Sequence, residues 1–198
     1  MNQPKIAMVI LAAGESSRMG GEVKQLLPWK KTTLLGHVIE QGLASNVDKI
    51  IIVLGANYHL IRDTISNYDV SVVYNPDWKK GMGTSLAFAI RTITENQQEF
   101  DAVLVSLADQ PLIDKKHFNS LIYNYIDSDK NICTTKINNN LGVPAVLDKC
   151  YFGQLIKLAG DTGARKIISQ NMKDVLTVEN DKSIDIDDMN TYISLYKN

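Results

Sequence analysis

Short apolar runs rich in β-branched residues alternate along the chain with stretches of helical spacing, and this alternation restricts the fold most. The apolar runs predict strands, and the spaced apolar residues between them predict helices. Expected strands cover 6–11, 49–54, 70–74, 101–107 and 131–137, and expected helices cover 34–43, 58–65, 83–93 and 118–126. Right-handed crossovers then give a mostly parallel twisted sheet with helices on both faces, a three-layer α/β/α architecture.

The pattern changes after residue 138, where shorter elements follow. They are a β-like segment at 142–147, a helix at 152–158, a short helix through 168 capped by Asp161 or Thr162, strands at 175–178 and 183–186, and a helix at 187–196. No repeat or long linker divides the 198 residues, of which 44% are hydrophobic. We therefore predict a single domain over 1–198.

Charge and cysteine content exclude several classes of protein. The net charge of −1 and the pI of about 6.3 provide no general basic field for nucleic acid. The apolar run Ile6–Ala13 is too short to span a bilayer, and no basic segment with a long apolar stretch precedes it. Cys133 and Cys150 form no CxxC pattern, which predicts reduced thiols. We expect a cytoplasmic protein with neither nucleic-acid nor membrane partners.

A polar loop with glycines, Arg18 and Lys24 follows the first strand, where ligands bind in open α/β sheets. Its backbone N–H groups and its two cations favour an anion, and a nucleoside triphosphate fits best. A Walker A loop is excluded because Gly20 is followed by Gly21 rather than Lys, and no Gly-x-Gly pattern starts at Gly14. The alternative is a glycine-rich surface turn with incidental charges.

This segment resembles the L-A-A-G-x-S-x-R-M-G signature, with a lysine shortly after it, of the GT-A-like nucleotidyltransferases. Within them the chain is most similar to the MobA/MocA-like group, the molybdenum cofactor cytidylyltransferases, from about Ile6 to Tyr192. The resemblance implies a GT-A-like fold and a loop that wraps the nucleotide. The second alanine favours cytidine, since guanylyl-transferring relatives more often have L-A-G-G. Base and ribose would contact Leu11, Ala12, Ala13 and Gly14, and the phosphates would contact Arg18 and Lys24.

A second segment, Gly81 to Ser85, opens a helix that Thr84 or Ser85 can cap. A helix N-terminus favours anions, although these residues taken alone are better explained by an ordinary capped helix start. The segment resembles the G-M-x-x-S-L motif of the same family, which lies beside the nucleotide base. The resemblance therefore implies nucleotide-binding roles for Gly81 and Ser85.

Two acidic segments predict a magnesium site. Asp109 follows a strand and is fixed by Pro111, where a carboxylate can bind Mg2+ together with substrate phosphates, although it could instead start a turn. Alternation in I-D-I-D places Asp185 and Asp187 on one strand face, although this could be a solvated edge strand. The resemblance to L-A-D-x-P and to D-I-D-T-P implies Asp109 and Asp187 as metal ligands, with Asp185 as the second choice. The Thr-Pro pair of the D-I-D-T-P motif is absent from this chain, in which Asp188 and Met189 follow Asp187.

The acceptor side is indicated by G-D-T-G-A-R at 160–165, which matches G-D-x-G-A-R of the family. The match implies that Asp161 and Arg165 bind an anionic acceptor such as the phosphate of molybdopterin. An ion pair between Asp161 and Arg165, four residues apart on one helix face, is an equal alternative. The family's G-H-P segment has Val143 in place of its histidine.

Together these residues predict an enzyme that moves CMP from CTP to the phosphate of molybdopterin and releases pyrophosphate, with Mg2+ as cofactor. Lys24, Arg18 and Asp109 would be catalytic, through positioning and charge neutralisation. Alternatives are a GTP-dependent guanylyltransferase of the same cofactor and a cytidylyltransferase for a sugar or alditol phosphate. An alternative of another class is a non-catalytic nucleotide- and cofactor-binding chaperone for a molybdoenzyme, which would be a transient partner.

Overall fold

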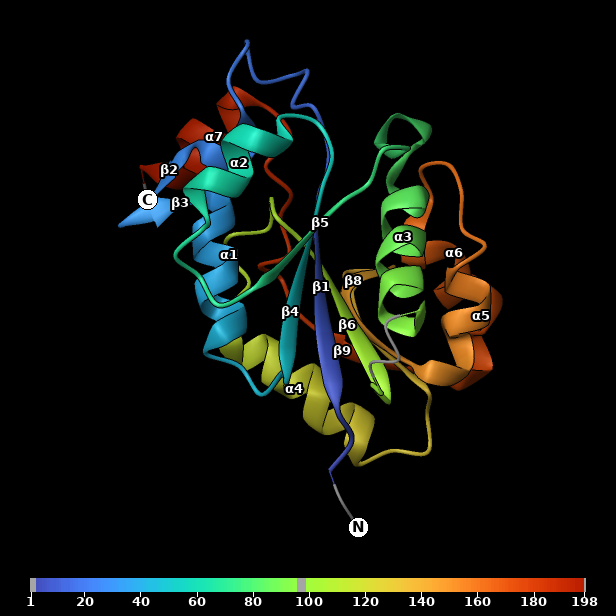
Figure 1. The fold of residues 1–198 in the computed structure, drawn as a ribbon. Coiled ribbons are helices and arrows are strands. Elements are labelled where there is room, and N and C mark those ends of the chain that lie inside the picture. Colours follow the sequence, from blue (N-terminus) through green and yellow to red (C-terminus); the bar gives the residue numbers. More distant parts are fainter. Residues whose placement is uncertain (1–2, 96–98, 198) are drawn as a thin grey trace.

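A computed structural model describes residues 3–95 and 99–197, and their main sheet has the strand order β5-β4-β1-β6-β8-β7-β9 (Figure 1). A small sheet pairs β2 with β3. The strands are β1 (Ile6–Ala12), β2 (Pro28–Trp29), β3 (Thr32–Thr33), β4 (Lys49–Leu54), β5 (Ser71–Tyr74), β6 (Ala102–Leu107), β7 (Ile132–Ile137), β8 (Asn140–Asp148) and β9 (Val175–Glu179). The helices are α1 (Leu34–Leu43), α2 (Tyr58–Thr64), α3 (Met82–Glu95), α4 (Lys115–Ile126), α5 (Phe152–Leu155), α6 (Gly163–Gln170) and α7 (Met189–Tyr196).

The pairing of strands confirms a mostly parallel sheet. Strand β1 lies parallel to both β4 and β6, and β9 lies parallel to β7. Only β8 among the described strands of this sheet runs in the opposite direction, since it is antiparallel to β6 and β7. The expected alternation of strands and helices therefore holds through β7, and the β7–β8 hairpin then follows it.

Helices cover both faces of the sheet because its central strands are apolar on both sides. In β1, Ala7, Val9 and Leu11 belong to one apolar cluster with residues of α3, α5 and α6, while Met8 and Ile10 belong to another with residues of α1 and α4. Figure 1 shows these two groups of helices on opposite sides of the sheet. A strand buried on both faces has no polar alternation, which is why it appears in the sequence as a continuous apolar run. The predicted three-layer α/β/α architecture is confirmed.

Several elements differ from the prediction. Residues 183–186 form no strand, because their backbone runs past the end of β6 without a ladder partner and Ile186 N–H donates to Asp109 O at 2.9 Å. The helix expected at 152–158 is shortened to α5. Thr162 lies at the N-cap position of α6 but its side chain makes no capping hydrogen bond. Helix α3 begins already at Met82, so Thr84 and Ser85 lie inside its first turn rather than capping it.

A separate apolar cluster ties distant segments together around the end of the chain. Met19 from the loop after β1 packs there with Trp29, Leu34, Ile186 and Tyr192, all of them buried. The Tyr192 hydroxyl also donates to Pro28 O at 2.7 Å. The cluster fixes the loop after β1 and the segment before α7 relative to each other.

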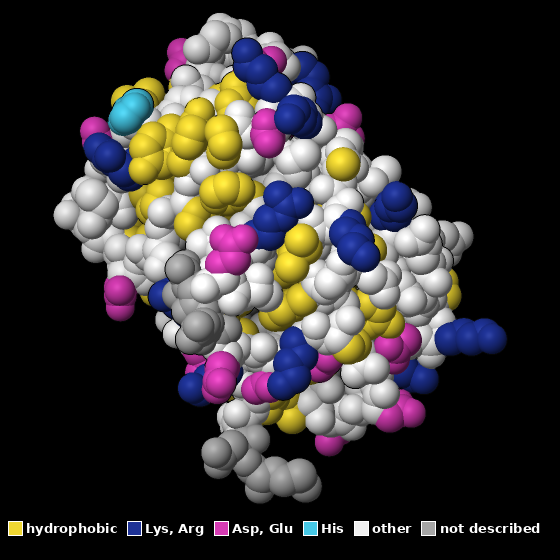
Figure 2. Space-filling model, turned by 45° about the vertical axis from the view of Figure 1, so that its right-hand side comes forward, with side chains coloured by type: hydrophobic (Ala, Val, Ile, Leu, Met, Phe, Trp, Pro, Cys, Tyr) yellow, Lys and Arg dark blue, Asp and Glu magenta, His cyan; other side chains and the backbone are white. Residues whose placement is uncertain are grey.

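The surface of the protein mixes charges of both signs. Figure 2 shows Lys and Arg side chains interspersed with Asp and Glu, and hydrophobic side chains that form their largest group at the upper left of this face. Leu60 of α2 and Tyr74 of β5 are among the exposed large hydrophobic residues. No helix in residues 3–95 or 99–197 is long and apolar enough to cross a membrane.

A buried histidine connects α4 to the β7–β8 hairpin. Nε2 of His117 lies 2.8 Å from Thr135 Oγ1, and the Thr135 hydroxyl donates to Pro144 O at 2.6 Å. Because the single hydroxyl proton of Thr135 is directed at Pro144, the imidazole must carry its proton on Nε2 and donate it. Burial lowers the pKa of His117 below its usual value of 6.5 and outweighs the opposite effect of Asp114.

We expect the stability of the fold to fall as the pH drops below about 6.5. A lowered histidine pKa means that the unfolded chain binds the proton more readily than the folded chain. The loss from His117 should reach at most about 1.4 kcal/mol for each pH unit between 6.5 and its folded-state pKa. Urea unfolding at about pH 7.5 and at about pH 5.5 measures this. His117→Gln should reduce the loss, whereas His59→Gln, at an exposed position, should not.

Candidate nucleotide site

A cavity of about 360 Å³ opens where β1 and β6 end side by side. The two strands are in register at Leu11 and Leu107, and Ala108 N–H donates to Leu11 O at 3.1 Å. This pairing brings the loop after β1 next to the loop after β6. The lining residues come from both loops, η2 (Trp78–Lys80), α3 and two later segments: Leu11, Ala12, Ala13, Gly14, Glu15, Arg18, Lys24, Gln25, Trp78, Lys79, Gly81, Met82, Ser85, Leu107, Ala108, Asp109, Asp161 and Asp187.

The buried amide of Gln25 holds the loop after β1 in shape. Its Nε2 donates to Ala12 O at 3.1 Å and to Gly14 O at 2.9 Å. Its Oε1 accepts from the Ser16 hydroxyl at 3.1 Å, and Ser16 Oγ accepts from Lys24 N–H at 3.0 Å. Gln25, which is only 3% exposed, thus bonds the first part of the loop directly, and Ser16 links that part to the backbone of Lys24.

The loop after β1 adopts a left-handed backbone conformation at three positions, of which only two are glycines. Gly20 and Gly21 have φ values of +65° and +95°, as glycines permit. Gly14 is not in the left-handed region, and Ser16 adopts it instead with φ 64°. Because Met19 is anchored in the apolar cluster, its neighbour Arg18 lies at the cavity and extends toward Asp187.

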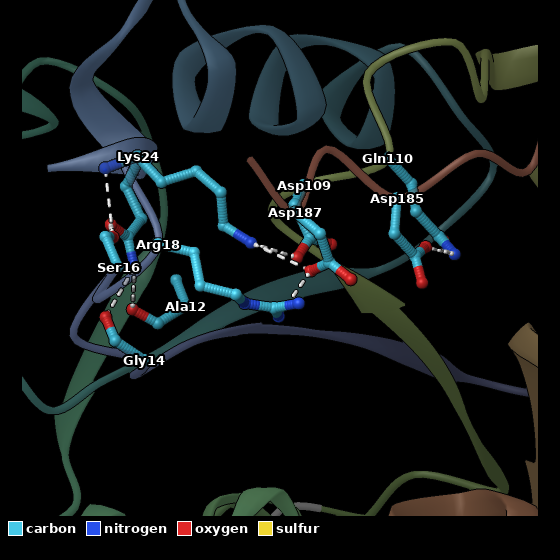
Figure 3. A network of polar contacts seen from close by, with 10 residues as sticks. Ala12, Gly14, Ser16, Arg18, Lys24, Asp109, Gln110, Asp185 and Asp187 are labelled. Atoms are coloured by element: carbon cyan, nitrogen blue, oxygen red, sulfur yellow. Dashed lines mark hydrogen bonds and ion pairs between the residues drawn. The ribbon is translucent and has the colours of Figure 1, made fainter. Parts of the chain in front are cut away.

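Opposite charges meet at one end of the cavity (Figure 3). Lys24 Nζ lies 2.7 Å from Asp109 Oδ2 and 3.8 Å from Asp187 Oδ1. Arg18 Nη2 lies 3.1 Å from the same Asp187 oxygen. The side chains of Lys24 and Asp109 are 17% and 19% exposed, whereas those of Arg18 and Asp187 are 68% and 47% exposed. The inner pair is therefore the better shielded from solvent and is the stronger electrostatic contact.

The carboxylates at this end have the features of a cation site. Asp109 Oδ1 is buried and has no hydrogen-bond partner. An unpartnered buried carboxylate oxygen is unfavourable, and a hard cation would satisfy it. No group of three or more His, Cys, Asp or Glu side chains in the described residues could hold a metal ion. Asp109 and Asp187 fit a metal such as Mg2+ that takes its other ligands from phosphates and water.

Asp185 lies beside this pair but faces away from it. Its Oδ1 accepts from Gln110 Nε2 at 2.7 Å, and Figure 3 shows both side chains on the far side of Asp109 from Lys24. Asp185 is exposed as a whole residue, yet partial burial of its carboxylate raises the pKa of Asp185. The negative charge of Asp109 raises it further, while the Gln110 bond opposes both effects.

The opposite end of the cavity is formed by η2 and the start of α3. Asn75 Nδ2 donates to Ser85 Oγ at 3.0 Å and fixes that buried hydroxyl. Gly81 has φ +106°, and a Cβ there would lie 2.4 Å from the carbonyl carbon of Gly160. Only glycine permits this approach, which brings Asp161 into the lining of the cavity. Trp78 completes this end of the cavity.

A second cavity of about 300 Å³ adjoins the first. Arg165 and Asp161 both line it, and no ion pair within 4 Å joins these two described residues. The intrahelical ion pair considered from the sequence is therefore not formed. Both side chains remain available at the position where the sequence placed an acceptor.

The structure brings all of the predicted nucleotide-binding and metal-binding residues into one cavity, and their roles stay predictions. Three residues that contribute to the site were missed from sequence alone: Gln25, Trp78 and Gln110. Gln25 and Gln110 are polar residues inside or beside apolar segments. Because buried amides need hydrogen-bond partners, this position in the sequence could have indicated a structural role for them. Trp78 lies just before the second motif, where an aromatic side chain is equally consistent with covering the rim of the core.

Comparison with known proteins identifies the relatives of the chain. A family model described as MobA-like NTP transferase domain matches residues 8–175. Nicotine blue oxidoreductase of Paenarthrobacter nicotinovorans is 30% identical over 181 residues, which cover 84% of this chain and 83% of that protein. Bifunctional protein GlmU of Francisella tularensis subsp. novicida is 28% identical over 167 residues, 83% of this chain. The match spans only 35% of GlmU.

Solved structures agree with this relationship. Rv0371c from Mycobacterium tuberculosis is 27% identical with a TM-score of 0.86, and the match covers 100% of both chains. A complex of Rv0371C with manganese is 26% identical with a TM-score of 0.80 over 98% of both chains. A nucleotidyl transferase from Methanothermobacter shares the fold, with a TM-score of 0.83 at 20% identity over 98% of this chain and 96% of that one.

We expect Gln25→Met to damage the loop after β1, because the substitution removes the amide that bonds Ala12 O and Gly14 O. Leaving buried polar groups without partners should lower the free energy of unfolding by about 1–3 kcal/mol. Urea unfolding measures this loss. Gln154→Met, at an exposed position of α5, is the matched control and should stay within about 0.5 kcal/mol of the original protein. Equal stability of the two variants would show that Gln25 does not brace the loop.

Proposed function

The chain belongs to the family of MobA-like NTP transferase domains and is a nucleotidyltransferase, and we propose that it moves CMP from CTP to the phosphate of molybdopterin. The observation that carries this proposal is the meeting of Lys24, Arg18, Asp109 and Asp187 at one end of a cavity lined by Leu11 to Gly14. Cations and carboxylates arranged together suit a triphosphate with a divalent metal. A cavity for an uncharged ligand would need neither.

The arrangement of the cavity supports one orientation for the nucleotide. Triphosphate oxygens would lie at Lys24 and Arg18, where the cations are. The base would then lie toward Ser85 and Trp78, at the other end. Ala13 is 8% exposed at the cavity wall, and its methyl group takes up space that a glycine would leave open. The smaller space supports a pyrimidine base, in agreement with the preference for cytidine expected from Leu-Ala-Ala-Gly.

The proposed reaction is a direct displacement at the α-phosphorus of CTP. An oxygen of the acceptor phosphate forms the new bond to this phosphorus, the bond to the bridging oxygen of the β-phosphate breaks, and pyrophosphate leaves. Lys24 and Arg18 would hold the phosphates and neutralise the charge that develops on them. Asp109 and Asp187 would hold Mg2+, which supplies further charge neutralisation when bound.

We expect Lys24→Ala and Asp109→Ala each to reduce CTP-dependent pyrophosphate release by about 100-fold, since each removes one charged contact to the phosphates or metal. Lys149→Ala is the matched control. Its ammonium also lies 2.7 Å from an aspartate, Asp101, but outside the cavity. It should keep near-normal turnover. Competition among the four nucleotides in the same assay should favour CTP, and preference for GTP would identify the guanylyltransferase alternative.

Metal binding provides a test that needs no turnover. Lys24 Nζ contacts both proposed ligand carboxylates, so a bare cation must displace it. Lys24→Met should therefore bind Mn2+ more tightly than the original protein when nucleotide is absent, by about tenfold, equivalent to ~1.4 kcal/mol. Free Mn2+ is measured by electron paramagnetic resonance. Adding Asp109→Asn to Lys24→Met should remove the gain, and unchanged Mn2+ affinity in Lys24→Met would reject these ligands.

Redox catalysis is a second candidate function, because a relative at 30% identity is named nicotine blue oxidoreductase. A cavity with places for ribose and phosphates could also take a nicotinamide dinucleotide. The two candidates differ in product. Oxidation of NADH or NADPH without pyrophosphate release from any nucleoside triphosphate would favour the redox candidate.

A further inference from the structure

The second cavity shares a wall with the proposed nucleotide cavity. Leu11, Met82, Leu107 and Asp161 line both. Two cavities with a common wall at the end of β1 can hold two molecules in contact. A transfer reaction requires this, since donor and acceptor must meet at the reacting phosphorus.

Asp185 and Asp187 are divided between the two cavities. Asp187 lines the nucleotide cavity, and Asp185 lines the second cavity. Between them, Ile186 is fully buried in the apolar cluster and its N–H bonds to Asp109 O. This anchored residue holds the two flanking carboxylates in place. The local geometry assigns different surroundings to each, so they are not interchangeable.

Gln110 holds the Asp185 carboxylate from behind. Its Nε2 donates to Asp185 Oδ1 at 2.7 Å and lies 3.4 Å from Val143 O. Gln110 is 3% exposed, and its Oε1 has no partner. One oxygen of Asp185 is therefore fixed by an immobile amide. The other oxygen has no hydrogen-bond partner among the described residues and can accept from a ligand.

The remaining lining of the second cavity is mostly apolar. Val105, Leu107, Val143 and Ala164 contribute aliphatic side chains. Arg165 is the cation of this lining, and it forms no ion pair with any residue in 3–95 or 99–197. Such a cavity suits a ligand with an anionic group, an apolar or flat body, and an N–H or O–H donor. A polyol would leave most of its hydroxyl groups against aliphatic carbon.

We propose that Asp185 recognises the acceptor by accepting a hydrogen bond from an N–H or O–H donor on its body, and that Gln110 is the positioning residue for this carboxylate. The proposal rests on the proposed function, because it places the phosphate acceptor of that reaction in the second cavity. The acceptor class is a heterocyclic phosphate with ring N–H donors rather than an alditol phosphate. Asp187, in contrast, serves the nucleotide side.

Asp185→Asn tests this assignment, with Asp187→Asn as the matched control. The amide introduced by Asp185→Asn would present a donor where the carboxylate presented an acceptor. Molybdopterin binding is measured by calorimetry in the presence of a CTP analogue that cannot be cleaved between its α and β phosphates. Asp185→Asn should weaken molybdopterin binding by about tenfold or more and leave the affinity for the analogue with Mg2+ unchanged. Asp187→Asn should instead weaken binding of the analogue.

The outcomes separate this inference from the proposed function. If Asp185→Asn weakens analogue and Mn2+ binding as Asp187→Asn does, Asp185 is a metal ligand and the inference is wrong. Equal binding of molybdopterin by the original protein and by Asp185→Asn, or none by either, also overturns it. Weaker molybdopterin binding without any CTP-dependent pyrophosphate release would overturn only the proposed function.

Gln110→Met provides a second variant that keeps the side-chain volume and removes the amide. If Gln110 acts through Asp185, this variant should raise the KM for molybdopterin by several-fold with little change in kcat, and should add little in the Asp185→Asn background. Additive effects of the two substitutions would show that Gln110 does not act through Asp185.

Discussion

The contact between Lys24 and Asp109 connects the two loops on which the whole site depends. One follows β1 and the other follows β6, and the parallel pairing of these strands places their carboxyl ends together. At 2.7 Å and with both side chains mostly buried, the ammonium and carboxylate hold these loops at a fixed separation. A charged ligand that enters between the loops would replace this ion pair with its own contacts to Lys24 and Asp109. The charged side chains are therefore already in position before a ligand binds.

The apolar cluster behind this contact explains how exposed charges are kept in place. Met19 and Ile186 are both buried in it, and each is next to a charged residue that faces the cavity. Arg18 and Asp187 are thereby brought to 3.1 Å of each other although they lie near opposite ends of the chain. An ion pair between exposed side chains contributes little stability itself. Its position comes from the burial of the neighbouring apolar residues.

The sequence predicted the first part of the fold well because its strands are buried on both faces and its helices are amphipathic. Beyond β8 the prediction was less accurate. Residues 183–186 alternate like a strand, yet Ile186 is buried by a cluster instead of a sheet, and periodicity cannot distinguish these two kinds of burial. The site residues were predictable where a motif places charge at a strand end, as at Asp109. The hydrogen bonds by which Gln25 and Gln110 hold the site residues in place join segments that are apart in the sequence. A local sequence pattern cannot predict such bonds.

In each of two segments, 109–110 and 185–187, neighbouring residues belong to different cavities. A few residues can therefore position both substrates of a transfer reaction. Asp109 and Asp187 line the first cavity, while Gln110 bonds Asp185 at the second. The hydrogen bond from Ile186 N–H to Asp109 O links the two segments directly. A shift in either segment would therefore move the ligands of both cavities together. Binding of one substrate would be coupled to the position of the other through this backbone contact and the Gln110–Asp185 hydrogen bond.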